Sequence, residues 1–170
     1  MRVRYAETDR MGYCYYGNFA AFFEVARVEA LRDLGVTYRD MEDQGVVLPV
    51  LDYQIKYFKP AYYDEQLRIE TIIKEVKGAR IFFDYKTFNE ADEQINAAST
   101  TLVFVDYATK RPMNPPAHLF QILFLALAMN QIFDFQCDCS PSQEKVSDQN
   151  ALKCVSFVQL DDHIPLVQME

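Results

Sequence analysis

The sequence contains no tryptophan and only two histidines, His118 and His163, in 170 residues. Neither histidine lies within residues 1–116, so a Ser–His or Cys–His nucleophile cannot be built from that part of the chain alone. His118 could still reach such a site from the segment that follows, which we treat as a minor alternative. The motifs G-x-S-x-G, G-x-G-x-x-G, H-E-x-x-H and the P-loop are also absent, which argues against the hydrolase, dinucleotide, metalloprotease and nucleotide sites that they form.

Basic residues are in the minority. The chain has 17 Lys and Arg against 25 Asp and Glu, for a net charge of −8. Proteins that bind a phosphate backbone usually carry a surplus of the opposite sign, so we expect no nucleic-acid partner. Hydrophobic residues make up 50% and charged residues 25% of the chain, which is typical of a folded domain and excludes collagen-like and wholly disordered chains.

Cysteines are few, and their positions form no known framework. Cys14 stands alone, Cys137 and Cys139 are one residue apart, and Cys154 lies further on. This spacing matches neither a disulfide scaffold nor a zinc site, so we expect free thiols, no metal and no cofactor. The first residues lack the apolar core of a signal peptide, and the apolar run after Pro116 is shorter than the roughly 20 residues that cross a bilayer. We therefore predict a cytoplasmic protein without a membrane span.

The composition of the chain changes near Pro115-Pro116. Most of the periodic signal lies before this point, so we predict a main domain over residues 1–116. Residues 117–170 form a C-terminal extension of unknown role in this prediction. An apolar helix is expected at about 118–135, followed by an irregular tail.

One long helix is predicted over residues 18–34. Asn18 can cap its first turn, because an Asn side chain accepts hydrogen bonds from the unpaired N–H groups there. Gly35 then ends the helix. Apolar residues recur at steps of three and four along one face: Phe19, Phe22, Phe23, Ala26, Ala30 and Leu34.

Alternating apolar and polar residues predict strands over 46–58, 67–76, 80–88 and 95–105. One early helix followed by long antiparallel strands indicates an α+β fold. The sheet must bury one face, and the helix at 18–34 is the only apolar helix before residue 116. We therefore expect an antiparallel sheet wrapped around that helix.

The residues most suited to chemistry lie between Tyr5 and Phe19. This segment joins the carboxylate of Asp9, a loop with Gly12 and several tyrosines, and the start of the predicted helix. Unpaired N–H groups at a helix start can hold a developing oxyanion, and a nearby carboxylate can act as general base or nucleophile. The spacing alone leaves a second interpretation open, in which Asp9 only caps a turn and the tyrosines belong to the core.

Residues 3–35, with the run Thr8-Asp9-x-x-Gly12 and then Asn18-Phe19, resemble the signature of hotdog-fold acyl-CoA thioesterases. The resemblance continues through Tyr57-Phe58-Lys59-Pro60-Ala61 and the strand pattern to Asn114-Pro115-Pro116. The subgroup is that of 4-hydroxybenzoyl-CoA thioesterase and the Tol–Pal-associated thioesterases. The implied fold is the hotdog, and the implied reaction is hydrolysis of an acyl-CoA thioester to a free acid and CoA.

The resemblance also implies roles for individual residues. Asp9 would be the catalytic general base or nucleophile, and the backbone N–H of Tyr16 or Gly17 would polarise the thioester carbonyl. Many Tol–Pal-type relatives have histidine where this chain has Tyr16, which removes a possible acid or base. A second departure is Tyr63-Asp64, where relatives often have Gly-Asp.

The substrate side of the site is also inferred from the resemblance. Tyr13, Tyr15 and Phe19 would line the acyl pocket, with core packing as the alternative. Lys59 would bind CoA phosphates, and a solvated surface charge is the alternative there. The full set of basic candidates for the phosphates is Lys56, Lys59, Lys77, Arg80, Lys110 and Arg111.

Family members form homodimers or homotetramers with active sites at the subunit interface, so we expect a homo-oligomer. A free edge strand gives dimerisation a physical reason as well. A hotdog hydratase is disfavoured, because those enzymes generally use a histidine in the core domain. A non-catalytic module that binds acyl-CoA or an acyl carrier remains the main alternative.

Overall fold

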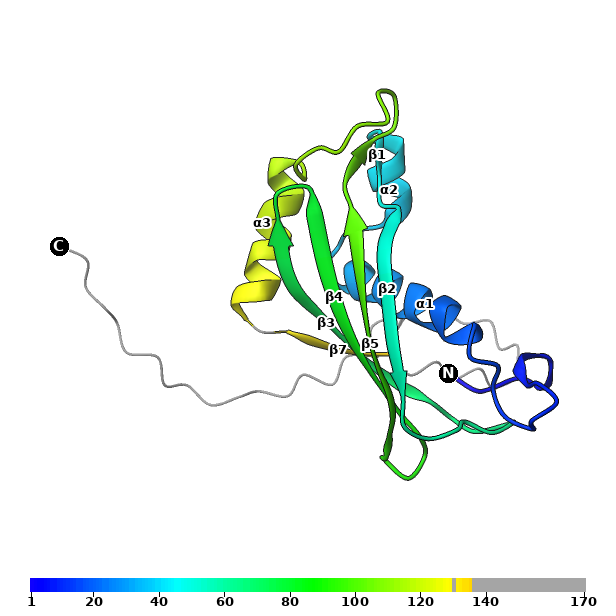
Figure 1. Ribbon diagram of the computed structural model, residues 1–170. Helices are drawn as coiled ribbons and strands as arrows, with labels where there is room; N and C mark the ends of the chain where they lie inside the picture. Colours follow the sequence, from blue (N-terminus) through cyan, green and yellow to red (C-terminus); the bar gives the residue numbers. More distant parts are fainter. Residues whose placement is uncertain (130, 136–170) are drawn as a thin grey trace, which may run out of the picture. The chain divides into compact units, whose positions relative to one another are not determined.

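A five-stranded antiparallel sheet curves around one long helix (Figure 1). The computed structural model describes residues 1–129 and 131–135, which belong to one compact unit. The spatial order of the strands is β2-β5-β4-β3-β7, and their bounds are Val50–Tyr57 for β2, Gln94–Val103 for β5, Arg80–Phe88 for β4, Arg68–Lys77 for β3 and Ile132–Phe135 for β7. The predicted α+β arrangement of a sheet around one helix is confirmed.

Helix α1 spans Asn18–Asp33, one residue shorter than predicted. The predicted apolar face packs on the sheet, where the ring of Phe23 stacks on that of Tyr85 with centroids 4.6 Å apart. Leu34 follows the helix, and Gly35 then takes a positive φ of +78°, a conformation that favours glycine. The seven buried residues of α1 are Phe19, Phe22, Phe23, Ala26, Arg27, Ala30 and Leu31.

Shorter elements connect these parts. A 3-10 turn, η1, spans Tyr5–Glu7, and helix α2 spans Tyr38–Asp43. Strands β1 (Val46–Val47) and β6 (Val105–Asp106) pair antiparallel and extend the contact between the chain segments that form β2 and β5. The predicted strand over 46–58 is therefore divided into β1 and β2.

The segment after Pro116 differs from its prediction. Helix α3 spans only Ala117–Ala128, and Ile132–Phe135 forms strand β7, which pairs antiparallel with β3. The helix predicted over 118–135 is thus wrong at its C-terminal end, because the edge of β3 binds this segment and Phe133 is buried on the inner face beside Thr71. Both elements belong to the same compact unit as the sheet. The predicted irregular tail lies outside the described residues.

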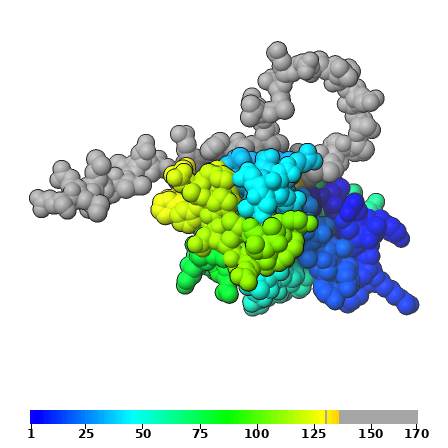
Figure 2. All heavy atoms as spheres, turned by 90° about the horizontal axis from the view of Figure 1, so that it is seen from above, coloured from blue at the N-terminus to red at the C-terminus, as the bar shows by residue number. Residues whose placement is uncertain are grey.

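Helix α3 and the N-terminal residues lie on opposite sides of this unit (Figure 2). The inner face of α3 packs through Leu119, Leu123 and Ala126. Within the described residues, no helix is both long and apolar enough to cross a membrane.

Candidate active site

The chain before α1 folds into a small hairpin that carries Asp9. Thr8 and Cys14 pair antiparallel, and the backbone N–H of Asp9 donates to the Tyr13 carbonyl at 3.0 Å. The turn closes when the Gly12 N–H donates to the Asp9 carbonyl at 3.0 Å. Gly12 has a φ of +85°, which glycine adopts without the strain that a Cβ brings. The glycine of the predicted loop thus lets the hairpin turn tightly.

The Asp9 carboxylate is only partly engaged. Its Oδ1 accepts the Met11 N–H at 2.8 Å, as in an Asx turn. The second carboxylate oxygen has no hydrogen-bond donor among residues 1–129 and 131–135. The turn-capping interpretation of Asp9 therefore describes one oxygen, and the other oxygen is available for a second task.

The start of α1 presents two backbone N–H groups without an acceptor. The Cys14 N–H donates to the Ala61 carbonyl at 2.7 Å, and the Tyr15 N–H donates to the Glu7 carbonyl at 2.8 Å. The intervening N–H groups of Tyr16 and Gly17 have no acceptor in the part of the chain that the structure describes. They lie at the positive end of the helix dipole, where an oxyanion is stabilised.

Asn18 does not play its predicted capping part. The residue at the cap position is Gly17, and no side chain accepts a bond from the first turn. The amide Nδ2 of Asn18 instead donates to the Glu7 carbonyl at 2.7 Å. Because Asn18 already lies inside the helix, its side chain reaches back across the loop and ties η1 to α1.

A cavity of about 390 Å³ opens beside this hairpin. Its lining includes five of the predicted site residues: Asp9, Tyr13, Tyr16, Phe19 and Lys59. The further lining residues are Met11, Cys14, Tyr57, Phe58, Pro60 and Ala61. A mostly apolar wall with a few polar groups is typical of a small-molecule site.

Tyr15 and Gly17 do not line this cavity. The ring of Tyr15 lies over Gly17 so closely that a Cβ on Gly17 would be 2.7 Å from the Tyr15 ring carbon Cε1. Gly17 therefore accommodates the Tyr15 ring, while its own backbone N–H stays free. The structure thus separates these two predicted residues from the other five.

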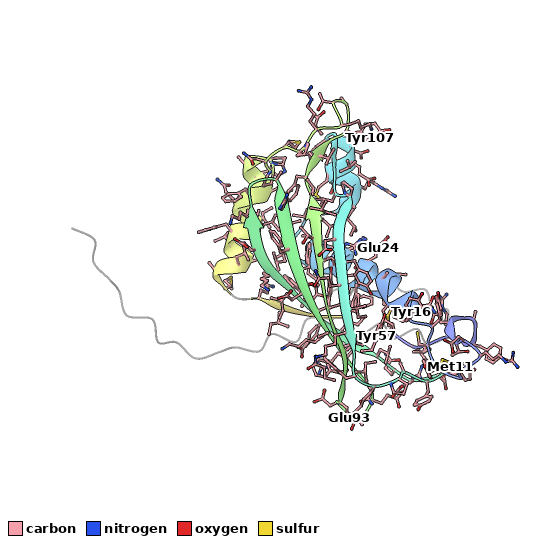
Figure 3. All side chains as sticks on the ribbon, in the orientation of Figure 1. Met11, Tyr16, Glu24, Tyr57, Glu93 and Tyr107 are labelled. Atoms are coloured by element: carbon pink, nitrogen blue, oxygen red, sulfur yellow. The ribbon has the colours of Figure 1, made fainter. Side chains whose placement is uncertain are left out.

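Tyr57 is one of the lining residues to which sequence reasoning gave no role. Its hydroxyl donates to the Tyr16 carbonyl at 2.9 Å, and its ring packs edge-on against Phe19 with centroids 5.6 Å apart. Figure 3 shows Tyr16 and Tyr57 near the start of α1, with Met11 on the loop beyond. Tyr57 therefore connects the end of β2 to the start of the helix. The only sequence signal was its place in the Tyr57-Phe58-Lys59-Pro60-Ala61 run.

Cys14 is a buried thiol in the cavity wall. Its pKa is raised to about 11, mainly by burial; a contact with the Asn18 side chain lowers the pKa, and the charges of Glu7 and Asp9 raise it. The thiol is therefore neutral near pH 7 and a poor nucleophile. This agrees with the prediction that Cys14 serves as a small buried hydrophobe.

The basic candidates for CoA phosphates are not gathered in one place. The Lys59 ammonium pairs with Glu93 Oε1 at 2.5 Å. Lys77 and Arg80 line a different cavity of about 570 Å³. Arg80 is next to the core residue Ile81 in β4, so this second cavity lies on the face of the sheet away from α1.

The remaining predicted groups are not part of the Asp9 cavity. His118 is exposed on α3 and does not line the cavity. No group of three or more His, Cys, Asp or Glu side chains within residues 1–129 and 131–135 is arranged to hold a metal ion. Cys137, Cys139 and His163 lie outside the described residues.

An antiparallel five-stranded sheet around one long helix is the architecture of hotdog-fold thioesterases. Residues 3–123 match the model of the thioesterase-like superfamily, and the chain belongs to that family.

Curated relatives carry matching names. The putative acyl-CoA thioesterase YneP of Bacillus subtilis is 38% identical over 113 residues, which are 66% of this chain and 82% of the relative. The acyl-CoA thioester hydrolase YbgC of Escherichia coli O6:H1 is 30% identical over 116 residues, 68% of this chain and 87% of the relative. Among solved structures, a DHNA-CoA thioesterase from Staphylococcus aureus matches with a TM-score of 0.73 and 34% identity over 76% of this chain and 89% of that chain.

Proposed function

We propose that this protein hydrolyses an acyl-CoA thioester to a free acid and CoA. The observation that carries the proposal is that Asp9 lines the same cavity as Tyr16, whose backbone N–H has no acceptor among the described residues, with the unpaired N–H of Gly17 next along the chain. The names of YneP and YbgC support the choice of an acyl-CoA as substrate. Thioesters have a good leaving group, so a carboxylate and an oxyanion site suffice without imidazole.

The first step places the thioester carbonyl oxygen against the N–H groups of Tyr16 and Gly17. These donors and the dipole of α1 stabilise the negative charge that develops on this oxygen. In the general-base route, Asp9 takes a proton from a water molecule while the water oxygen bonds to the carbonyl carbon. The carbon–sulfur bond then breaks, and the CoA sulfur receives the proton from Asp9.

In the nucleophilic route, the free oxygen of Asp9 bonds to the carbonyl carbon itself. The CoA thiolate leaves, and an anhydride between Asp9 and the acyl group remains. One water molecule then hydrolyses this anhydride: its oxygen and one proton become the hydroxyl group of the free acid, its other proton goes to the CoA thiolate, and the Asp9 carboxylate is restored. Both routes require the same Asp9 oxygen that is not bonded to Met11.

The acyl group would lie against the apolar wall of the cavity. Tyr13 and Phe19 contribute to this wall, together with Tyr57. Tyr15 acts in the proposal through its packing on Gly17, because its ring does not line the cavity. Lys59 would bind a CoA phosphate by exchanging its Glu93 partner for the phosphate.

We further propose that the active form is a homodimer built through the edge of β2, with a homotetramer as the next level of assembly. Within the described residues, β2 pairs on one side only, with β5. Val50, Leu51, Tyr57 and Phe58 are exposed along or beside this edge. Tyr57 and Phe58 also line the cavity, so a second copy at this edge would lie against the site. The cytoplasmic location stays a prediction.

The proposed activity is tested with a panel of acyl-CoAs and a thiol-reactive reporter of free CoA. Thiol release by the wild type that is lost in Asp9→Ala, at an unchanged melting temperature, supports the proposal. Binding of acyl-CoA without thiol release favours the alternative of a non-catalytic binding module. Light scattering on the same samples measures the oligomeric state, and a monomer with full activity would contradict the dimer.

A further inference from the structure

The carbonyl of Tyr16 and the N–H of Gly17 belong to one peptide group. This group is trans, so it is planar and its C=O and N–H bonds point in opposite directions. Whatever fixes the direction of the Tyr16 carbonyl therefore also fixes the direction of the Gly17 N–H. That N–H has no acceptor among the described residues, and the proposed reaction uses it to hold the thioester oxygen.

Two donors bind the Tyr16 carbonyl within residues 1–129 and 131–135. The Tyr57 hydroxyl donates to it at 2.9 Å, within the usual range for a hydroxyl, and Figure 3 shows both residues at the start of α1. The Phe19 N–H donates to it at 3.4 Å, which is long for a backbone donor. The shorter bond therefore comes from the side chain at the end of β2 and not from the helix itself.

The Tyr57 side chain is held in this place from two sides. The Ile95 carbonyl accepts the N–H groups of Phe58 at 2.8 Å and Lys59 at 3.1 Å, which binds the end of β2 to β5. The Tyr57 ring packs edge-on against Phe19 in the first turn of α1, with centroids 5.6 Å apart. Burial raises the pKa of the Tyr57 hydroxyl, so it keeps its proton and can donate near pH 7.

The bond to Tyr57 affects both the direction and the strength of the opposite donor. Because Phe19 in α1 also donates to the Tyr16 carbonyl, this carbonyl points along the helix, and the Gly17 N–H points out of the helix start. Hydrogen bonds in a chain polarise one another, so a carbonyl that accepts a bond makes the N–H of its own peptide group a stronger donor.

We propose that Tyr57 is a positioning residue for the oxyanion donor: its hydroxyl orients the Tyr16–Gly17 peptide group and strengthens the Gly17 N–H that binds the thioester oxygen. This inference rests on the proposed thioester hydrolysis. The hydroxyl acts through the peptide group and does not contact the substrate oxygen. Its effect is greatest in the transition state, where the negative charge on that oxygen is largest.

A spectroscopic measurement tests the effect on the peptide group directly. Tyr57→Phe removes the hydroxyl and keeps the ring. The chain has five glycines, so protein labelled with ¹⁵N-glycine gives at most five amide signals. We expect the ¹⁵N shift of Gly17 to change in Tyr57→Phe, because the nitrogen and the Tyr16 carbonyl share one peptide group. The signals of Gly35, Gly45 and Gly78 should stay in place, and an unmoved Gly17 signal would overturn the proposal.

Kinetics test whether this bond matters to the reaction. The substrate is the acyl-CoA of the panel that the wild type hydrolyses fastest. Loss of a whole oxyanion donor lowers kcat by about 10²–10³-fold, so a weakened donor should lower it by about tenfold with KM changed by less than about twofold. A higher KM at unchanged kcat would show that Tyr57 only shapes the cavity wall, and would overturn the proposal.

Tyr85→Phe is the matched control. Its hydroxyl is hydrogen-bonded to Thr100 at 2.9 Å, and its ring stacks on Phe23 in α1. This variant therefore also loses a tyrosine hydrogen bond beneath α1, but not one to the Tyr16 carbonyl. We expect a lower melting temperature with unchanged kcat per folded molecule and an unmoved Gly17 signal. An equal loss of kcat in both variants would assign Tyr57 a purely structural role.

This inference and the proposed reaction fail in different ways. A wild type that releases no thiol from any acyl-CoA overturns the proposed function, and the role of Tyr57 with it. An active wild type together with a Tyr57→Phe variant of equal kcat overturns this inference alone. The same holds if the Gly17 signal moves while kcat stays the same, because the bond would then exist without affecting the reaction.

Discussion

Glu7 and Asp9 lie two residues apart, yet the two turns that carry them use their carboxylates differently. Glu7 is 7% exposed, and both of its oxygens accept bonds from Arg4. These bonds come from the backbone N–H at 2.8 Å and from the guanidinium Nε at 2.8 Å. Asp9 accepts one bond, from the Met11 N–H, and lines the cavity.

Glu7 therefore has a structural role in its turn, whereas Asp9 has a carboxylate oxygen that is available to a substrate. A carboxylate whose oxygens are both bonded to its own turn holds the loop in place but is not available to a substrate. Asp9 keeps one bond, to the Met11 N–H, and its other oxygen is the one that the proposed mechanism uses. The nearby Glu7 carbonyl ties the same loop to α1 through Tyr15 and Asn18.

The largest expected effect comes from Asp9→Asn. The amide oxygen of Asn can still accept the Met11 N–H, so the turn should remain folded and the melting temperature nearly unchanged. The loss of the carboxylate should lower kcat by about 10²–10⁴-fold, the range typical of a general base. Thiol release and thermal melting measure the two effects. A variant that keeps most of its kcat would remove Asp9 from the reaction.

Glu7→Gln should have the opposite effect, with a loss of stability and little change in activity. Gln cannot form the charged pair with Arg4, and a hydrogen bond to a charged group contributes about 1.5–3 kcal/mol. Because the Arg4 side chain is 79% exposed, we discount this to about 1 kcal/mol. The melting temperature should fall by several degrees while kcat per folded molecule changes little.

Glu65→Gln serves as its control. Glu65 Oε2 accepts the Tyr62 N–H in an exposed turn, so its loss should cost less stability. A Glu7→Gln variant that is as stable as the wild type but inactive would reverse the assignment of the two carboxylates.

Much of the fold was predictable because its signals are local. The helix at 18–34 follows from apolar residues at steps of three and four, and the strands follow from alternation and turn residues. The C-terminal segment was mispredicted because Ile132–Phe135 continues an apolar run. Its strand form depends on the free edge of β3, which is distant in the sequence.

The site was predictable in composition but not in detail. The sequence places Asp9 and the helix start together, whereas the free N–H groups of Tyr16 and Gly17 depend on which neighbours are paired. Asn18 was expected to accept a bond and instead donates one, because the Glu7 carbonyl lies within its reach.

Asn18→Asp tests the Glu7 carbonyl, which accepts hydrogen bonds from both Tyr15 and Asn18. A carboxylate near a helix start normally stabilises the helix through its dipole. In this structure it would lose the donor to the Glu7 carbonyl and place a negative charge against that oxygen. We expect a net loss of about 1 kcal/mol, within the range for a broken hydrogen bond. Urea unfolding measures this loss, and a gain in stability would show that the interaction of the carboxylate with the helix dipole outweighs the lost hydrogen bond.

The smallest expected effect is on the alkylation rate of Cys14, which depends on the charges of both Glu7 and Asp9. Its thiol has a pKa of about 11 in the folded protein, against 9.0 for an ordinary thiol. Since the folded-state pKa is raised, the thiol contributes stability that is fully present below pH 9 and is lost as the pH rises towards 11. Alkylation of Cys14 by iodoacetamide should therefore be slow at pH 8 in the folded protein and fast in urea, as measured by peptide mass spectrometry.

The variants at Glu7 and Asp9 then show which of the two carboxylates raises the pKa of the Cys14 thiol more. Glu7 raises the Cys14 pKa more than Asp9 does, after the larger effect of burial. Glu7→Gln should therefore speed the alkylation of folded Cys14 by more than Asp9→Asn, each by a few-fold at most, because burial stays the same. If Asp9→Asn gave the larger increase in alkylation rate, the Asp9 carboxylate would lie closer to the Cys14 thiol than the Glu7 carboxylate does. Its free oxygen would then be directed at the thiol and away from a bound thioester.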